Sequence, residues 1–478
     1  MRYTLMSLRA DLQPKNSRRA TNPLKVVAIA GVSGSLVLVF ALVAVAMVAD
    51  RVTPIGETTL HLEPKVAVLS ARRAPTTLSI LTRTSRVRRA LADVSSKIPT
   101  NGCLSVEWLG QSMSDIRSDQ MFTPASAVKV ITAAAALEVL GPNFTYETNV
   151  YGALDASGTV GDLYIVGGGD PLIVRSEYLA TEKYPTTTPT TLESIADAIV
   201  AAGVRSIAGS VVGVDSRYDS KRFIDKWPTS FNMVEAGPLG ALMANDGAVI
   251  GQPFKSDNPA WAAATELTSL LAARGVVAST LPRHDVLVSG VAKITTIKSA
   301  PLSDIVKEML TSSDNNTAEL LLKEIGLAKT GIGSTQAGLD ATTSLLSSWG
   351  LAATVSIHDG SGLAMDNKAS CKAFLAILKT NTDLFIPTMA VAGKTGTLRD
   401  VFTKESVNGR LIAKTGTLTG VKSLVGYLPI VDSEPVRFSL LMNRAGIDNQ
   451  SAYRSIWYSL SQAMDKARST PSVDQLMP

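Results

Sequence analysis

The chain has 478 residues and a formal net charge of +5, and this charge is concentrated at one end. Residues 1–25 hold six basic side chains and one acidic side chain, which leaves 46 − 6 = 40 basic and 41 − 1 = 40 acidic residues in the remainder. Nucleic-acid binding needs Lys and Arg on the folded domain, so this neutral remainder argues against a nucleic-acid partner. Three scattered histidines and two cysteines exclude a His-rich or Cys-cluster metal site and a disulfide-dense scaffold. We therefore expect no metal and no cofactor.

The segment after this basic tail is apolar. Residues 26–49 form a run of 24 residues without a charge, and about 20 apolar residues span a bilayer as a helix. The apolar region of a cleaved signal peptide is shorter, about 7–15 residues, which favours a retained transmembrane signal anchor; small residues near the end of the run leave cleavage open. Because positive charge precedes the run, we expect residues 1–25 in the cytoplasm and the chain after residue 49 outside.

Residues 50–88 are predicted to be a linker. They contain three prolines and a Thr-rich stretch, and they show no sustained hydrophobic period. A short amphipathic helix is expected to begin near residues 89–94. The final residues, 469–478, are interpreted as a second tail.

Hydrophobic periodicity predicts both strands and helices in the exported part. The predicted strands cover residues 103–108, 163–166, 210–214, 285–289, 423–428 and 436–442. The predicted helices cover residues 126–140, 302–310, 318–327, 335–349 and 451–468. A sheet closed by N- and C-terminal helices, with further helices on another face, is an α/β sandwich. Cys103 and Cys371 can form one disulfide in an oxidising compartment or remain buried thiols, and the sequence leaves both open.

The first motif that carries chemistry is Ser126-Ala-Val-Lys129. Thr123 is predicted to cap the helix here and Pro124 to occupy its first position, which places Ser126 in the first turn. Lys129 lies three residues later and therefore on the same helix face. A serine needs a nearby base to become a nucleophile, and a buried lysine that is partly neutral can supply it. Taken alone, the same spacing is common in ordinary capped helices.

The second motif is Ser313-Asp314-Asn315, which lies just before a helix expected to start at Thr317. The Ser313 hydroxyl can relay a proton to a leaving amine. The Asn315 amide can hold a lysine and a substrate carbonyl. Taken alone, this segment is a good helix-capping loop and nothing more.

The third motif, Lys-Thr-Gly-Thr, occurs twice, at residues 394–397 and 414–417. A glycine within a strand lets another backbone approach closely, and the adjacent cation can bind a carboxylate. Lys414 follows a strand-like segment and precedes Gly420 and another strand, which predicts a hairpin. Lys394 has no such context and is predicted to lie in a loop. We therefore choose Lys414 as the functional copy.

Together and in this order, S-x-x-K, S-D-N and K-T-G are the signature of serine penicillin-binding proteins and class A β-lactamases. The chain resembles the D-alanyl-D-alanine carboxypeptidase/endopeptidase family of low-molecular-mass penicillin-binding proteins. Further stretches that look similar lie at residues 167–171 (GGGDP), 239–247 (LGALMANDG), 359–363 (DGSGL) and 396–399 (GTLR). The resemblance covers about residues 90–468.

The resemblance implies an α/β fold, a penicillin-binding-protein/β-lactamase-like sandwich of antiparallel sheet and helices. Lys129 and Ser313 are 313 − 129 = 184 residues apart, which is more than the helical subdomain of a β-lactamase needs. The family carries inserted domains at this point. We therefore expect residues 89–150 and 301–468 to form one discontinuous peptidase domain, and residues 151–300 to form an inserted β-rich domain.

The resemblance also implies catalytic roles. Ser126 is expected to be acylated by the carbonyl group of the penultimate D-Ala, and Lys129 to be the base that activates it. Ser313 and Asn315 are expected to shuttle protons and position the substrate.

Substrate binding is expected at the third motif. Lys414, Thr415, Gly416 and Thr417 are expected to bind the terminal carboxylate. The oxyanion hole of the family would be formed here by the backbone N–H groups of Ser126 and Thr417, fixed donors directed at the developing charge. The duplicated Lys-Thr-Gly departs from the family, whose members usually keep only Gly-Thr-Leu at the first position.

The resemblance implies a membrane-anchored serine DD-carboxypeptidase on the cell-wall side of the cytoplasmic membrane, with DD-endopeptidase as a second activity. Its partners would be peptidoglycan stem peptides, β-lactam inhibitors and the membrane. A β-lactamase is one alternative, and the lack of a clear Glu-containing loop between the first two motifs argues against it. A catalytically silent peptidoglycan-binding protein is the other, and the intact motif residues argue against that.

Overall fold

A computed structural model describes residues 74–468. The predicted basic tail (1–25), the apolar span (26–49), most of the predicted linker (50–88) and the final tail (469–478) lie outside the described residues. Within the part that is described, no helix is long and apolar enough to cross a membrane.

The centre of the larger domain is a six-stranded sheet in which every neighbouring pair is antiparallel. The strand order is β15-β16-β17-β18-β1-β2, so the first two strands of the chain pair beside the last one. The bounds are β1 (Gly102–Trp108), β2 (Gln111–Ile116), β15 (Ala390–Val391), β16 (Ile412–Leu418), β17 (Val421–Leu428) and β18 (Val436–Asn443).

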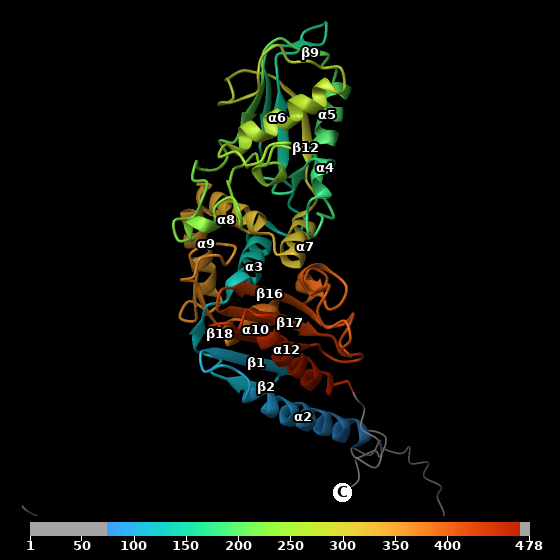
Figure 1. The fold of residues 1–478 in the computed structure, drawn as a ribbon, viewed down its shortest axis with the longest axis vertical. Helices are drawn as coiled ribbons and strands as arrows, with labels where there is room; N and C mark the ends of the chain where they lie inside the picture. Colours follow the sequence, from blue (N-terminus) through green and yellow to red (C-terminus); the bar gives the residue numbers. More distant parts are fainter. Residues whose placement is uncertain (1–73, 469–478) are drawn as a thin grey trace, which may run out of the picture. The chain divides into compact units, whose positions relative to one another are not determined.

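Helices cover both faces of this sheet, because its central strands alternate apolar side chains to either side. The first and last described helices, α2 (Ala74–Ser95) and α12 (Gln450–Asp465), pack on one face around Trp457. The other face packs against a layer of helices (Figure 1). These are α3 (Val128–Leu140), α7 (Leu302–Ser312), α8 (Asn315–Thr330), α9 (Thr335–Ser348), α10 (Cys371–Thr380) and α11 (Thr382–Phe385). The predicted α/β sandwich is therefore confirmed.

The helix α2 corrects the predicted start of the domain. It begins at Ala74, so the C-terminal part of the predicted linker is helical and the domain does not start at residue 89. Arg and Thr residues interrupt the apolar pattern, which is why the sequence showed no sustained period. The burial of Val87, Leu91 and Val94 on one side of the helix stabilises it against the rest of the fold.

A disulfide joins the sheet to the helix layer. Cys103 in β1 and Cys371 at the start of α10 are bonded, with their Cα atoms 6.0 Å apart. The sequence had left this pairing open. A small three-stranded sheet lies beside it, formed by β13 (Val355–Ser356), β14 (Lys368–Ser370) and β3 (Met121–Phe122).

The inserted domain has its own sheet, in the order β11-β10-β6-β4-β12. The strands are β4 (Glu147–Tyr151), β6 (Leu163–Val166), β10 (Val211–Val214), β11 (Arg283–His284) and β12 (Lys293–Lys298). The helices α5 (Leu192–Ala201) and α6 (Pro259–Ala272) cover one face and share its apolar core (Figure 1). Smaller elements are β5 (Thr159–Val160), β7 (Ile173–Val174), α4 (Ser176–Leu179), β8 (Thr190–Thr191) and β9 (Ser206–Ile207).

Three predictions about this domain need correction. It begins at Glu147, before residue 151, because β4 pairs with β12 along the length of both strands. It is an α/β unit rather than merely β-rich, since α5 and α6 supply much of its core. Residues 285–289 are not a strand; the edge strand is β11 at Arg283–His284, which pairs in parallel with β10.

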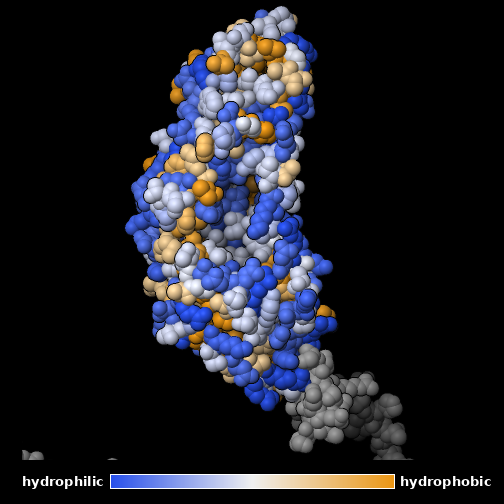
Figure 2. Space-filling view, in the orientation of Figure 1, coloured by the Kyte–Doolittle hydropathy of each residue, from blue (hydrophilic) through white to orange (hydrophobic). Residues whose placement is uncertain are grey.

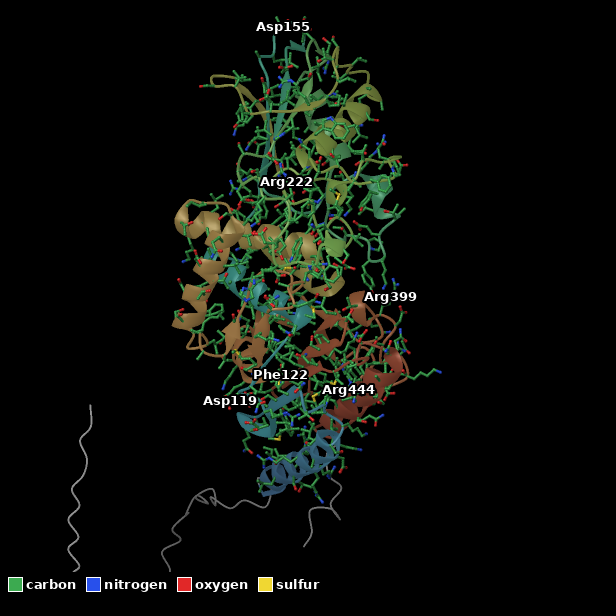
Figure 3. All side chains as sticks on the ribbon, turned by 60° about the vertical axis from the view of Figure 1, so that its left-hand side comes forward. Asp119, Phe122, Asp155, Arg222, Arg399 and Arg444 are labelled. Atoms are coloured by element: carbon green, nitrogen blue, oxygen red, sulfur yellow. A yellow bond between two sulfur atoms is a disulfide. The ribbon has the colours of Figure 1, made fainter. Side chains whose placement is uncertain are left out.

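Ion pairs made by two buried side chains of α8 join the inserted domain to the helix layer. The Nζ of Lys323, on α8, donates to Asp219 over 2.5 Å, and Arg217 donates to Glu324 of the same helix. Figure 3 labels Arg222 at the base of the inserted domain, near these helices. Because α8 begins at the second sequence motif, these contacts set the position of that motif relative to the inserted domain.

Candidate active site

The predicted nucleophile lies in a short 3-10 turn, Ala125–Ala127, directly before α3. Gly362 and Gly416 allow the surrounding backbone to approach this turn. A Cβ on Gly362 would lie 2.1 Å from the oxygen of Ala125, and a Cβ on Gly416 would lie 2.5 Å from the oxygen of Pro124. Side chains at either position would therefore displace the turn that carries Ser126.

The predicted helix cap at Thr123 is wrong. The Thr123 hydroxyl does not bond to the helix; it accepts a hydrogen bond from Lys368 Nζ over 2.7 Å and donates to the oxygen of Met365. The Thr123 hydroxyl, which the local sequence pattern predicted to cap the helix, therefore bonds to residues that are distant in the sequence.

Lys129 is completely buried one turn after Ser126. Its Nζ lies 3.3 Å from Ser126 Oγ, 2.6 Å from Asn315 Oδ1 and 2.6 Å from the oxygen of Ser361. Burial lowers the pKa of Lys129 from its ordinary value to about 8, against the opposing effect of the Asp359 carboxylate and others nearby. This lysine is therefore neutral part of the time at neutral pH, as a general base requires.

The turn at residues 359–362, whose Ser361 oxygen accepts a hydrogen bond from Lys129, is fixed by two buried carboxylates. Glu319 accepts hydrogen bonds from the backbone N–H groups of Gly360 and Ser361, and Asp359 accepts from that of Gly362. Burial, and the nearby Asp359 charge, raise the pKa of Glu319. The motif Asp-Gly-Ser-Gly had entered only as a supporting similarity, and its contact with Lys129 was not predicted.

The second motif lies between two helices. Ser313 ends α7 with a left-handed backbone, φ 70°, and the Asp314 side chain accepts from the N–H of Thr317. The helix α8 therefore begins at Asn315, not at Thr317 as predicted. The Asn315 amide binds on both sides, because its oxygen accepts from Lys129 and its nitrogen donates to the backbone oxygen of Glu235 in the inserted domain.

The third motif lies on β16, which forms the predicted hairpin with β17. Lys414 is completely buried, and its Nζ donates to Ser313 Oγ over 2.8 Å and to the oxygen of Thr415 over 2.6 Å. Burial lowers the pKa of Lys414 well below its ordinary value, and the positive charges of Lys129 and Lys422 act in the same direction. Side chains of the three motifs therefore lie together, with Lys129 bonded to Ser126 and Asn315 and with Lys414 bonded to Ser313.

The other repeat lies in a loop, as predicted. Lys394 follows β15 and precedes the 3-10 turn Gly396–Leu398, and it lines a neighbouring cavity of about 480 Å³. Its Thr397 nevertheless reaches the site, where its hydroxyl accepts from that of Thr415 over 3.0 Å. The structure therefore places Lys414, rather than Lys394, beside Ser313.

These groups open into a cavity of about 610 Å³, and Figure 2 shows a hollow on this face below the inserted domain. Five of the site residues predicted from the sequence line this cavity: Ser126, Ser313, Asn315, Thr415 and Thr417. The sequence motifs did not indicate the lining that comes from the inserted domain, from β17, and from α12 and the segment just before it. These residues include Phe231, Glu235, Lys422, Asp448, Tyr453 and Trp457.

The family model of the D-Ala-D-Ala carboxypeptidase 3 (S13) family matches residues 104–252 and 246–463 of the chain. The chain belongs to this family. This confirms the resemblance drawn from the three motifs and identifies the protein as a serine-type D-Ala-D-Ala carboxypeptidase, a hydrolase of the penicillin-binding class.

Two curated relatives agree with this assignment, and a solved structure shares the fold. The chain is 26% identical over 452 residues to a D-alanyl-D-alanine carboxypeptidase of Actinomadura sp. (strain R39), covering 75% of this chain and 81% of that protein. It is 27% identical to carboxypeptidase Rv3627c of Mycobacterium tuberculosis, covering 72% and 76%. The fold is similar to the crystal structure of penicillin-binding protein 4 from Haemophilus influenzae, with TM-score 0.66, 20% identity, and coverage of 79% and 99%.

Proposed function

We propose that this carboxypeptidase removes the terminal D-Ala of peptidoglycan stem peptides through an acyl-enzyme on Ser126. One observation carries the proposal. Lys129 Nζ contacts both Ser126 Oγ and Asn315 Oδ1, while Lys414 Nζ contacts Ser313 Oγ on the other side of the same cavity. A nucleophile, a base and a carboxylate-binding cation thus converge without any histidine.

Acylation begins with proton transfer from Ser126 to Lys129. With a pKa of about 8, about a tenth of Lys129 is neutral at pH 7, whereas a lysine at its ordinary pKa would be neutral in only about one molecule in three thousand. Ser126 Oγ then attacks the carbonyl carbon of the penultimate D-Ala. The oxyanion that forms is assigned to the backbone N–H groups of Ser126 and Thr417.

Collapse of this intermediate requires a proton for the leaving amine. The Ser313 hydroxyl is placed to deliver it, since it bonds to Lys414 and faces the cavity. Ser313 receives in return the proton that Lys129 took from Ser126, so Lys129 is neutral again in the acyl-enzyme. Water then attacks the acyl-enzyme while Lys129 accepts its proton. Lys129 returns this proton to Ser126 Oγ as the ester bond breaks, which releases the shortened peptide and restores the enzyme. The terminal carboxylate binds at Lys414, Thr415, Gly416 and Thr417, and its negative charge favours the charged form of Lys414.

Three further properties belong to the same proposal. A β-lactam mimics the D-Ala-D-Ala end of the stem peptide and acylates Ser126, and cross-linked peptides are cleaved as a second, endopeptidase activity. A peptidoglycan endopeptidase of Bdellovibrio bacteriovorus shares this fold, with TM-score 0.52 at 18% identity. The uncharged run at residues 26–49 anchors the chain in the cytoplasmic membrane, with the catalytic domain on the cell-wall side.

The test is D-Ala release from a pentapeptide stem by the purified chain, compared with Ser126→Ala. Release by the wild type and its loss in the variant support the proposal; equal release by both contradicts it. Rapid hydrolysis of penicillin without an accumulated adduct would favour the β-lactamase alternative. The endopeptidase activity is tested separately with cross-linked muropeptides: their cleavage supports this activity, and their survival contradicts it.

A further inference from the structure

Lys422 lies in the active-site cavity and belongs to none of the three motifs. It stands on β17 directly opposite Thr417, so the two side chains share one face of the sheet. Lys422 Nζ donates to Thr417 Oγ1 over 2.7 Å. The Thr417 hydroxyl thus accepts from a cation, which leaves its own proton available to a ligand.

The ammonium group of Lys422 is buried and lacks a paired anion. The residue is 7% exposed, and its Nζ lies 4.1 Å above the ring of Tyr453 and 5.1 Å from that of Trp457. The carboxylate of Asp448 lines the same cavity and acts on Lys422 through its charge, but no carboxylate among residues 74–468 lies within 4.0 Å of this nitrogen. Aromatic faces stabilise a cation only in part, and a buried charge is costly unless an anion pairs with it. The missing anion is therefore expected from a ligand in the cavity.

The other two lysines of the site have little hydrogen-bonding capacity to spare. Lys129 Nζ contacts three oxygens, and Lys414 Nζ already donates to Ser313 and to the oxygen of Thr415. An ammonium group has only three donors. A carboxylate at the third motif thus needs donors and positive charge from elsewhere, and the pair of Lys422 and Thr417 supplies both.

We propose that Lys422 is a positioning and specificity-determining residue, which orients and polarises Thr417 for the free carboxylate at the end of the substrate. This inference rests on the proposed function and deepens it. Lys422 fixes the Thr417 hydroxyl as a donor that points into the cavity, and it adds a positive charge at that end. The preference for an ionised C-terminus over a neutral one therefore depends on Lys422.

The experiment compares kcat/KM on an N-acylated tripeptide ending in D-Ala-D-Ala with the same tripeptide as its C-terminal amide. For Lys422→Gln and Lys422→Met we expect a loss of about tenfold on the free acid and little change on the amide, because the lost contact is charge-assisted. Lys422→Arg should retain most of the preference. Lys404→Gln, which removes an exposed lysine, should leave both values unchanged.

Equal losses on both substrates would show that Lys422 only supports the fold and would overturn the inference, as would unchanged selectivity. Acylation by benzylpenicillin and by its methyl ester gives a second pair of ligands with and without a carboxylate, for which the same pattern is expected. If the wild type cleaves the D-Ala-D-Ala bond of neither tripeptide, the proposed function fails, and the penicillin pair still decides the role of Lys422.

Discussion

The tetrapeptide Lys-Thr-Gly-Thr occurs twice in this chain, and the two copies lie in different structures. Residues 414–417 belong to a strand in a hairpin, so Lys414 is buried and reaches Ser313. Residues 394–397 lie in a loop that turns into a short 3-10 helix, and Lys394 lines a neighbouring cavity. The same tetrapeptide therefore lies at the site in one copy and beside it in the other, depending on the backbone that carries it. The hairpin pattern of the flanking residues distinguishes the two copies, whereas the tetrapeptide alone does not.

The largest expected effect separates the two lysines. Lys414→Ala should lower the rate of acylation by a fluorescent penicillin at least about 100-fold, because it removes one partner of a buried, charge-assisted contact. Lys394→Ala should leave that rate within about twofold. The measurement is the second-order rate constant for labelling, and the reverse pattern would reject our choice of repeat.

The glycine of the hairpin repeat gives the next effect. A Cβ on Gly416 would lie 2.1 Å from Ser423 Oγ and 2.5 Å from the oxygen of Pro124, so Gly416→Ala pushes against the turn that carries Ser126. Acylation should fall about 10- to 100-fold, since small displacements of a nucleophile are costly.

A matched control lies in the turn of the same hairpin. Gly420 has a positive φ of 73°, and a Cβ there would lie 3.6 Å from the nearest atom, the oxygen of Arg444, so Gly420→Ala should lower the melting temperature and keep the acylation rate. Equal acylation losses in both variants would mean that strain in the hairpin, not contact with the nucleophile turn, explains the result.

The buried lysines beside the hairpin predict a pH profile. Lys129 is the acceptor of the Ser126 proton, so kcat/KM should rise with pH as Lys129 loses its own proton near its pKa of about 8. The Glu319 carboxylate raises the pKa of Lys129, so Glu319→Gln should move this rising limb to lower pH. A limb that stays in place or moves to higher pH would contradict the assigned electrostatics.

The smallest effect concerns a hydrogen bond that joins the two repeats. The hydroxyl of Thr415 donates to that of Thr397 over 3.0 Å. Thr397→Val should reduce acylation only several-fold, and a double-mutant cycle with Thr415→Val should give a coupling energy of about 1 kcal/mol. A coupling near zero would show that the loop repeat does not support the hairpin repeat.

The sequence predicted the fold class and which motif residues come together, but it missed much of the detail around them. Ser126, Lys129, Ser313 and Lys414 were found because their chemistry needs these residue types, and the structure brings them together. The Thr123 cap failed because a distant lysine bonds to that hydroxyl. Contacts of this kind depend on the completed fold and leave no local pattern.

The missed elements have the same physical origin. The helix α2 has Arg and Thr residues between its buried positions, and only packing against the rest of the domain stabilises it. Lys422 and Glu235 reach the cavity from a neighbouring strand and from the inserted domain. Neither residue belongs to a recognisable motif. Only the pairing register of β16 with β17 places Lys422 beside Thr417.

The central claim is that Ser126 is the nucleophile, and mapping the penicillin adduct tests it most directly. The chain is incubated with a fluorescent penicillin, digested and analysed by mass spectrometry, with Ser126→Ala as the control. We predict a long-lived adduct on the peptide that contains Ser126 and no adduct in the variant. An adduct on another serine, or unchanged labelling of the variant, would contradict the account.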